Sequence, residues 1–182
     1  MPMTVRDLSI IDGLDPKTIE EALSVLRRES DRGAVLVAIA ILDSVFASRL
    51  EKLFSHGNSD ARSRLLTRSF NSFASKVDLA YCVGMIPKQL YQDIRLLNKL
   101  RNQCAHEWGD FRITQQIVDT YIEPMMMKHA LNAANEVQPI LFPPGCAPKQ
   151  VLVSTLAALI TFANLFKPLP KAAVTEGAGD GS

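Results

Sequence analysis

One arginine and one histidine have a spacing that could support chemistry. Arg101 is the first and His106 the last residue of the run Arg-Asn-Gln-Cys-Ala-His, and the chain has only three histidines. A histidine and an arginine aimed at one phosphate suit metal-independent RNA cleavage. In that reaction the 2′-hydroxyl is the nucleophile, the histidine transfers protons, and the arginine stabilises charge on phosphorus. Neither a protein nucleophile nor a metal is required.

The helical geometry of this pair leaves two interpretations open. On a continuous helix Arg101 and His106 lie about 140° apart around the axis, so they share no face. For catalysis, either the helix ends near Ala105 and His106 turns back, or two subunits bring their copies together across a two-fold axis. In the structural interpretation, Arg101 pairs with a partly buried carboxylate and His106 meets the free carbonyls at the helix end.

A second polar group, Glu29, Arg32 and Asp43, falls at and within a very apolar segment. Arg32 and Asp43 return to within about 20° of each other on a helix. An internal salt bridge is one expectation. The functional alternative is that Asp43 or Glu29 orients Arg101 or His106.

Basic residues suggest nucleic-acid contacts at two places. Arg62, Arg64 and Arg68 lie beside two phenylalanines, a combination that could contact phosphates and stack on bases. Lys99 is a further candidate contact. The alternative for 57–71 is a solvated loop or a frayed helical entry. With 20 Lys+Arg against 19 Asp+Glu, the net charge is +1. A dedicated nucleic-acid-binding protein usually has a much larger positive charge.

Helical periodicity predicts the elements that position these residues. It favours helices over residues 16–28, 31–54, 73–83, 88–106, 113–122 and 151–166, with an extended connector over 138–149 and no strands. The segment 88–106 is the clearest amphipathic helix. Its apolar stripe is Leu90, Ile94, Leu97, Leu100 and Cys104, and its polar stripe is Lys88, Gln92, Arg95, Lys99, Asn102 and His106.

Length and composition indicate one all-α domain. The chain has 182 residues, 47% hydrophobic and 21% charged, which is enough to build a core. We expect an arm over 1–14, a bundle of about five to seven helices over 15–167, and a disordered tail over 168–182. The last helix is too short to span a bilayer, and no membrane association is expected.

The three cysteines predict neither a disulfide framework nor a zinc site, because they are widely spaced and odd in number. No motif indicates a cofactor or a metal ion. The N-terminal residues resemble no secretory signal, so we expect a cytoplasmic protein with free thiols.

Two stretches of sequence resemble a known family. The runs ESDRGAVLVAIAILDSVF and FASKVDLAYCVGMIPKQLYQDIRLLNKLRNQCAHEW are similar to the mannitol operon repressor family of bacterial all-helical proteins. The resemblance implies a cytoplasmic regulator that lowers transcription of a sugar-alcohol uptake operon, through another protein, since the family shows no obvious DNA-reading helix.

The run from Arg101 to His106 also resembles the Arg-x4-6-His motif of the HEPN superfamily, and Asn102 matches the polar residue after its arginine. HEPN proteins are helical bundles that often dimerise, and many cut RNA. This resemblance implies catalytic roles for Arg101, Asn102 and His106.

The sequence therefore favours a repressor-like transcriptional regulator that binds a protein or nucleic-acid partner. Its apolar second and last helices could supply a homodimer interface. The alternative is a HEPN-type metal-independent ribonuclease or toxin-like RNA-binding protein.

Overall fold

The computed structural model describes residues 16–54, 59–125, 129–131, 137–139 and 145–165. In chain order its elements are α2 (Pro16–Arg28), α3 (Asp31–Leu53), α4 (Ser59–Arg64), the π-helix η1 (Leu65–Ser69), α5 (Phe73–Cys82), α6 (Lys88–His106), α7 (Gln115–Ile117), the π-helix η2 (Val118–Ile122), β1 (His129–Leu131), β2 (Val137–Pro139) and α8 (Pro148–Leu165). This architecture confirms the all-α fold class. The arm over 1–14 and the tail over 168–182 lie outside the described residues.

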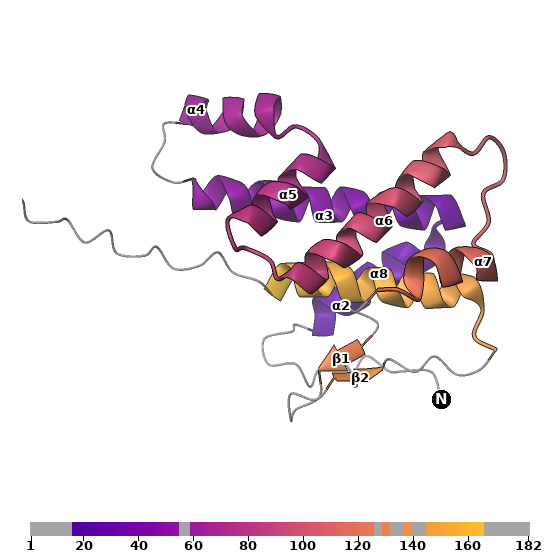
Figure 1. Cartoon of the computed structure of the whole chain (residues 1–182). Helices are drawn as coiled ribbons and strands as arrows, with labels where there is room; N and C mark the ends of the chain where they lie inside the picture. Colours follow the sequence, from indigo (N-terminus) through magenta and orange to yellow (C-terminus); the bar gives the residue numbers. More distant parts are fainter. Residues whose placement is uncertain (1–15, 55–58, 126–128, 132–136, 140–144, 166–182) are drawn as a thin grey trace, which may run out of the picture.

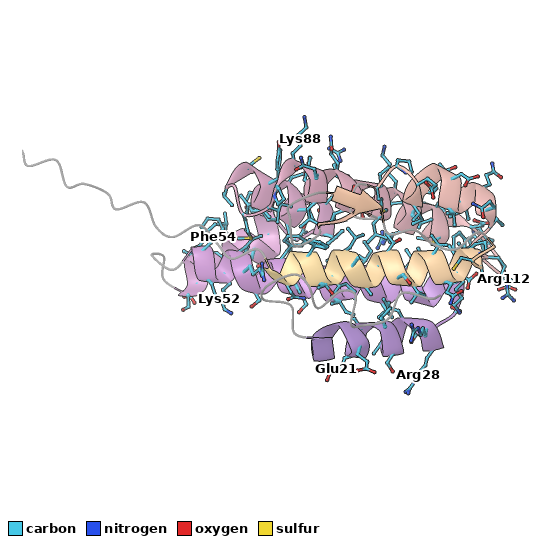
Figure 2. All side chains as sticks on the ribbon, turned by 90° about the horizontal axis from the view of Figure 1, so that it is seen from below. Glu21, Arg28, Lys52, Phe54, Lys88 and Arg112 are labelled. Atoms are coloured by element: carbon cyan, nitrogen blue, oxygen red, sulfur yellow. The ribbon has the colours of Figure 1, made fainter. Side chains whose placement is uncertain are left out.

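The helices pack in three layers. α3 and α8 form the middle layer, α2 covers one side of it, and α5, α6 and α7 cover the other, as Figure 2 shows. Figure 1 shows α6 crossing in front of α3. The core is continuous through these layers and includes Leu26 of α2, Phe46 of α3, Leu97 of α6 and Leu156 of α8.

α3 is the central helix that the apolar run predicts. Its N-terminus is capped by Ser30, whose hydroxyl accepts a hydrogen bond from the Gly33 amide at 3.0 Å. By length and composition alone α3 could also cross a membrane. In this fold it packs against α2, α5, α6 and α8 instead, with Leu42, Phe46 and Leu50 fully buried.

α8 is buried within the single chain. Apart from Ser154, residues 151–163 are all buried, because α8 packs against both α2 and α3. The expectation that this helix offers apolar surface to a second subunit is therefore wrong. The fold uses that surface to complete its own core.

The structure decides two short segments, the first of which the sequence left open between a loop and a frayed helical entry. Residues 59–69 are helical, as α4 and η1, although η1 has no buried residue. Helices that bury so little need no apolar stripe, which explains the missing signal. The expectation of no strands is also wrong, since β1 and β2 pair antiparallel with His129 opposite Pro139. Strands of three residues are too short for an alternating pattern of apolar and polar residues to be detected.

A tight turn sets α5 beside α6. Gly84 adopts a left-handed φ of 70°, as the sequence predicts for a glycine just after a helix. The Met85 amide donates to the Ala80 carbonyl at 2.8 Å. Pro87 then precedes the first residue of α6, so the chain reverses within a few residues and α5 packs along α6.

Candidate functional site

The exposed face of α6 carries charge of one sign. Every residue of the predicted apolar stripe is buried, and every residue of the predicted polar stripe is exposed. Asp93 is the single acidic residue of α6, and it is only 1% exposed. The exposed face therefore presents the cations of Lys88, Arg95, Lys99 and Arg101 with no exposed carboxylate from the same helix.

Arg95 is held in place by aromatic side chains. Its Nη1 donates a hydrogen bond to the Tyr91 hydroxyl at 3.0 Å, and its guanidinium lies 5.6 Å from the centre of the Tyr91 ring. The Tyr91 hydroxyl in turn donates to Asp78 of α5 at 2.9 Å. The Tyr91 ring stacks on Tyr81 with centroids 4.3 Å apart. The hydrogen bond to Tyr91 raises the pKa of Arg95 above its ordinary value.

Two hollows flank the side chains of Arg95 and Lys99. The first, between α5 and α6, has a volume of about 230 Å³. Its walls are Phe73, Ala74, Val77, Asp78, Ile94, Arg95, Asn98, Lys99 and Asn102. The second has a volume of about 340 Å³ and lies between α6 and the end of η2. It is lined by Gln92, Asp93, Arg95, Leu96, Lys99 and Pro124.

We call the first the α5–α6 hollow and the second the Pro124 hollow. Two residues of the sequence-derived site, Lys99 and Asn102, meet in the α5–α6 hollow. Arg101 joins them indirectly, because its Nη1 donates to the Asn102 side-chain oxygen at 3.1 Å. Arg95 was on the predicted polar stripe but was not among the site residues. The sequence feature that could have identified Arg95 is the spacing of Tyr91, Arg95 and Lys99, which lie four residues apart on one helical face.

The geometry of Arg101 and His106 excludes one of the two catalytic arrangements. α6 runs without a break to His106, and Glu107 is its C-cap residue. The helix ends one residue beyond Ala105, but His106 is still helical, so it does not turn back toward Arg101. Within one chain the two side chains project from different sides of α6. An arrangement across two subunits stays a prediction.

The carbonyls beyond the end of α6 are bound by Arg32. Its Nη2 donates to the Glu107 carbonyl at 2.7 Å and to the Gly109 carbonyl at 2.9 Å. The expected pairing of Arg32 with Asp43 is wrong, because residues that share a helical face this far apart in sequence are still separated by about three turns. Arg32 therefore ties the start of α3 to the segment that follows α6.

Asp43 and Glu29 make other contacts. Lys76 of α5 donates to both carboxylate oxygens of Asp43, at 2.8 and 2.9 Å. The Glu29 carbonyl accepts a hydrogen bond from Lys149 at 2.6 Å. These contacts join α5 to α3 and α8 to the α2–α3 turn, and the structure shows neither acidic residue orienting Arg101 or His106.

The predicted basic cluster lies elsewhere in the fold. Arg64 ends α4 and Arg68 lies in η1, and both are exposed. The side chain of Arg62 lies outside the described residues. Figure 1 shows α4 at the upper left and the C-terminal end of α6 at the upper right. The structure therefore does not bring Arg64 and Arg68 together with Arg101 and His106.

A second exposed feature follows α6. The side chain of Trp108 is 99% exposed, although the carbonyls on both sides of it are bound by Arg32. An indole presented on fixed backbone is unusual on a protein surface and typical of protein-binding anchors. The sequence showed Trp108 only as an interruption of the helical pattern.

These features define a class: an all-α bundle whose candidate site is a cationic binding surface. The fold is similar to a chain in the X-ray structure of the MtlR–HPr complex from Escherichia coli, with a TM-score of 0.61 and 18% sequence identity, covering 81% of this chain and 98% of that one. The sequence matches no protein-family model and no curated protein. The likeness confirms the fold expected from the mannitol operon repressor family and lends no support to the HEPN alternative.

Proposed function

We propose that this chain is a cytoplasmic regulatory protein that acts by binding a protein partner, and that it is a repressor-like regulator of transcription. The observation that carries the proposal is the fold likeness, which spans 98% of a chain from a complex between MtlR and a second protein. The exposed face of α6 supplies a surface suited to that role.

Binding through a protein is favoured over direct reading of an operator. The chain has a net charge of +1, whereas a protein that neutralises many phosphates needs a concentrated basic surface. The cations of α6 are few, and carboxylates lie beside them in both hollows. A limited polar contact with another protein fits these features better than an extended contact with the phosphate backbone of DNA.

The direct test is titration of the purified chain with HPr, because HPr is the protein bound in the similar structure. Isothermal calorimetry and size-exclusion chromatography should show saturable binding and a complex that elutes early. Heats at the level of dilution and separate elution, at the highest soluble concentrations of both proteins, would reject an HPr-type partner.

We also propose that the chain forms a homodimer, although α8 does not provide its interface. Light scattering over a dilution series measures the oligomeric state directly. A constant mass equal to that of one chain at all concentrations would reject the dimer. It would also remove the two-subunit arrangement of Arg101 and His106.

A further inference from the structure

We propose that Arg95 and Lys99 bind an acidic segment of a partner protein, with carboxylate side chains entering the hollows on both sides of this pair. The proposal rests on the proposed function in one respect, that the chain acts through a protein partner. It adds the location of the contact and the chemistry of the partner.

The first support is the position of the two cations. Arg95 and Lys99 are one helical turn apart on α6, and both line the α5–α6 hollow and the Pro124 hollow. A ligand that contacts both cations therefore has a recess available on either side of them. A chain crossing α6 could place one side chain in each hollow, whereas a small anion would fill only one.

The second support is that Arg95 is fixed before binding. It donates to the Tyr91 hydroxyl at 3.0 Å, and Tyr91 is itself stacked on Tyr81 and bonded to Asp78. Its side chain therefore loses less conformational freedom when a ligand binds than a free surface arginine would. The guanidinium still has donors for a carboxylate, because the bond to Tyr91 uses Nη1 alone.

The third support is the chemistry of the hollows. The α5–α6 hollow combines an apolar wall, formed by Phe73, Val77 and Ile94, with the polar groups of Asn98 and Asn102. The Pro124 hollow likewise combines Leu96 and Pro124 with Gln92. A glutamate matches this pattern, since its methylene groups contact apolar surface while its carboxylate accepts hydrogen bonds from amides and cations.

A nucleic acid fits the same surface less well. Each hollow also holds one carboxylate, Asp78 in one and Asp93 in the other, so Arg95 and Lys99 form a short contact suited to individual carboxylates and not the continuous basic surface that a phosphate backbone needs. The aromatic pair that holds Arg95, Tyr81 and Tyr91, is already stacked within the protein. It is therefore not free to stack on bases from both faces.

The test uses a short synthetic peptide of alternating glutamate and serine, titrated into the full chain and followed by two-dimensional amide NMR. We expect saturable shifts in α5 and α6, at residues that line the two hollows. The double variant Arg95→Gln/Lys99→Gln should weaken binding by about threefold to tenfold, as expected for losing two exposed charge contacts.

Lys88→Gln provides the matched control. Lys88 is an exposed cation at the start of the same helix, and Figure 2 shows its side chain pointing away from the bundle. Like each substitution in the double variant, this one removes one positive charge from α6, but Lys88 lines neither hollow. The affinity for the peptide should therefore stay near the wild-type value. Equal weakening by Lys88→Gln and by the double variant would show unspecific attraction and overturn the proposal.

Two further titrations separate the alternatives. Inorganic phosphate is added until its total negative charge equals that of the peptide. If it then displaces the peptide completely, the site binds single anions and the two-sided contact is wrong. If a single-stranded RNA binds more tightly than the peptide and depends on Arg95 and Lys99, the surface is a nucleic-acid site and the acidic partner is wrong. Neither titration uses HPr, so failure of that complex and failure of this site are distinguishable.

Discussion

Lys76 of α5 donates to both carboxylate oxygens of Asp43 on α3, at 2.8 and 2.9 Å, and the Lys76 side chain is only 10% exposed. The Asp43 side chain keeps 36% exposure. This contact fixes α5 against the central helix and so supports one wall of the α5–α6 hollow. An ammonium group this buried is tolerated because a carboxylate lies next to it.

We predict that Asp43→Asn lowers the free energy of unfolding by about 1–3 kcal/mol, because it leaves the buried Lys76 ammonium without a counter-charge. The double variant Asp43→Leu/Lys76→Met should recover most of that loss by replacing the ion pair with apolar contacts. Urea denaturation of the three proteins measures both effects. A loss below about 0.5 kcal/mol for Asp43→Asn would show that the pair does not stabilise the fold.

The bonds of Arg32 to the carbonyls of Glu107 and Gly109 predict a local effect. Arg32→Ala should lower the free energy of unfolding by about 1–3 kcal/mol and increase amide hydrogen exchange over residues 107–113. Arg112→Ala is the control, because the Arg112–Asp110 ion pair is exposed on both sides and such pairs contribute about 0–1 kcal/mol. Unchanged exchange in Arg32→Ala would contradict this role.

Burial raises the pKa of the Cys104 thiol from 9.0 to about 11. The unfolded chain therefore loses this proton at lower pH than the folded chain. Between pH 9 and 11 the folded state binds more protons, so stability should fall as pH rises through that window and be unaffected by this group below it. Comparison with Cys104→Ala isolates the contribution.

The same burial predicts selective thiol chemistry. Cys82 is exposed and Cys104 is buried, so a thiol reagent should modify Cys82 in the native protein and Cys104 only after unfolding. Mass spectrometry of the labelled protein identifies the sites. Rapid labelling of Cys104 under native conditions would show that this part of the core opens readily.

Trp108 is the only tryptophan in the chain and is 99% exposed. Native protein should therefore emit fluorescence at the wavelength of solvated indole, with little shift on unfolding. Trp108→Ala should change stability by less than about 0.5 kcal/mol. A blue-shifted native spectrum would mean that this side chain is covered, for example by a second copy of the chain.

For Arg101 and His106 we expect that a single chain does not cleave RNA in EDTA, since α6 separates the two side chains within one chain. His106→Ala and Arg101→Ala should also leave the melting temperature nearly unchanged, because both residues are exposed. Cleavage by the wild type that is lost in both folded variants would establish the two-subunit ribonuclease instead.

Residue type and spacing predicted most of the longer helices of this protein and their ends. The cap at Ser30, the start of α6 at Pro87, the left-handed glycine at 84 and the apolar stripe of α6 all follow from residue type and spacing, because capping and helical periodicity act within a few residues. These signals also placed Lys99 and Asn102 on one exposed face.

The packing of the helices determines which distant groups meet. Asp43 pairs with Lys76, 33 residues away, and Arg32 binds a carbonyl 75 residues away. Periodicity shows which face of a helix is buried but not which helix covers it, because the partner depends on how all the helices pack. For the same reason the two hollows beside Arg95 and Lys99, formed with α5 and Pro124, could not be read from α6 itself.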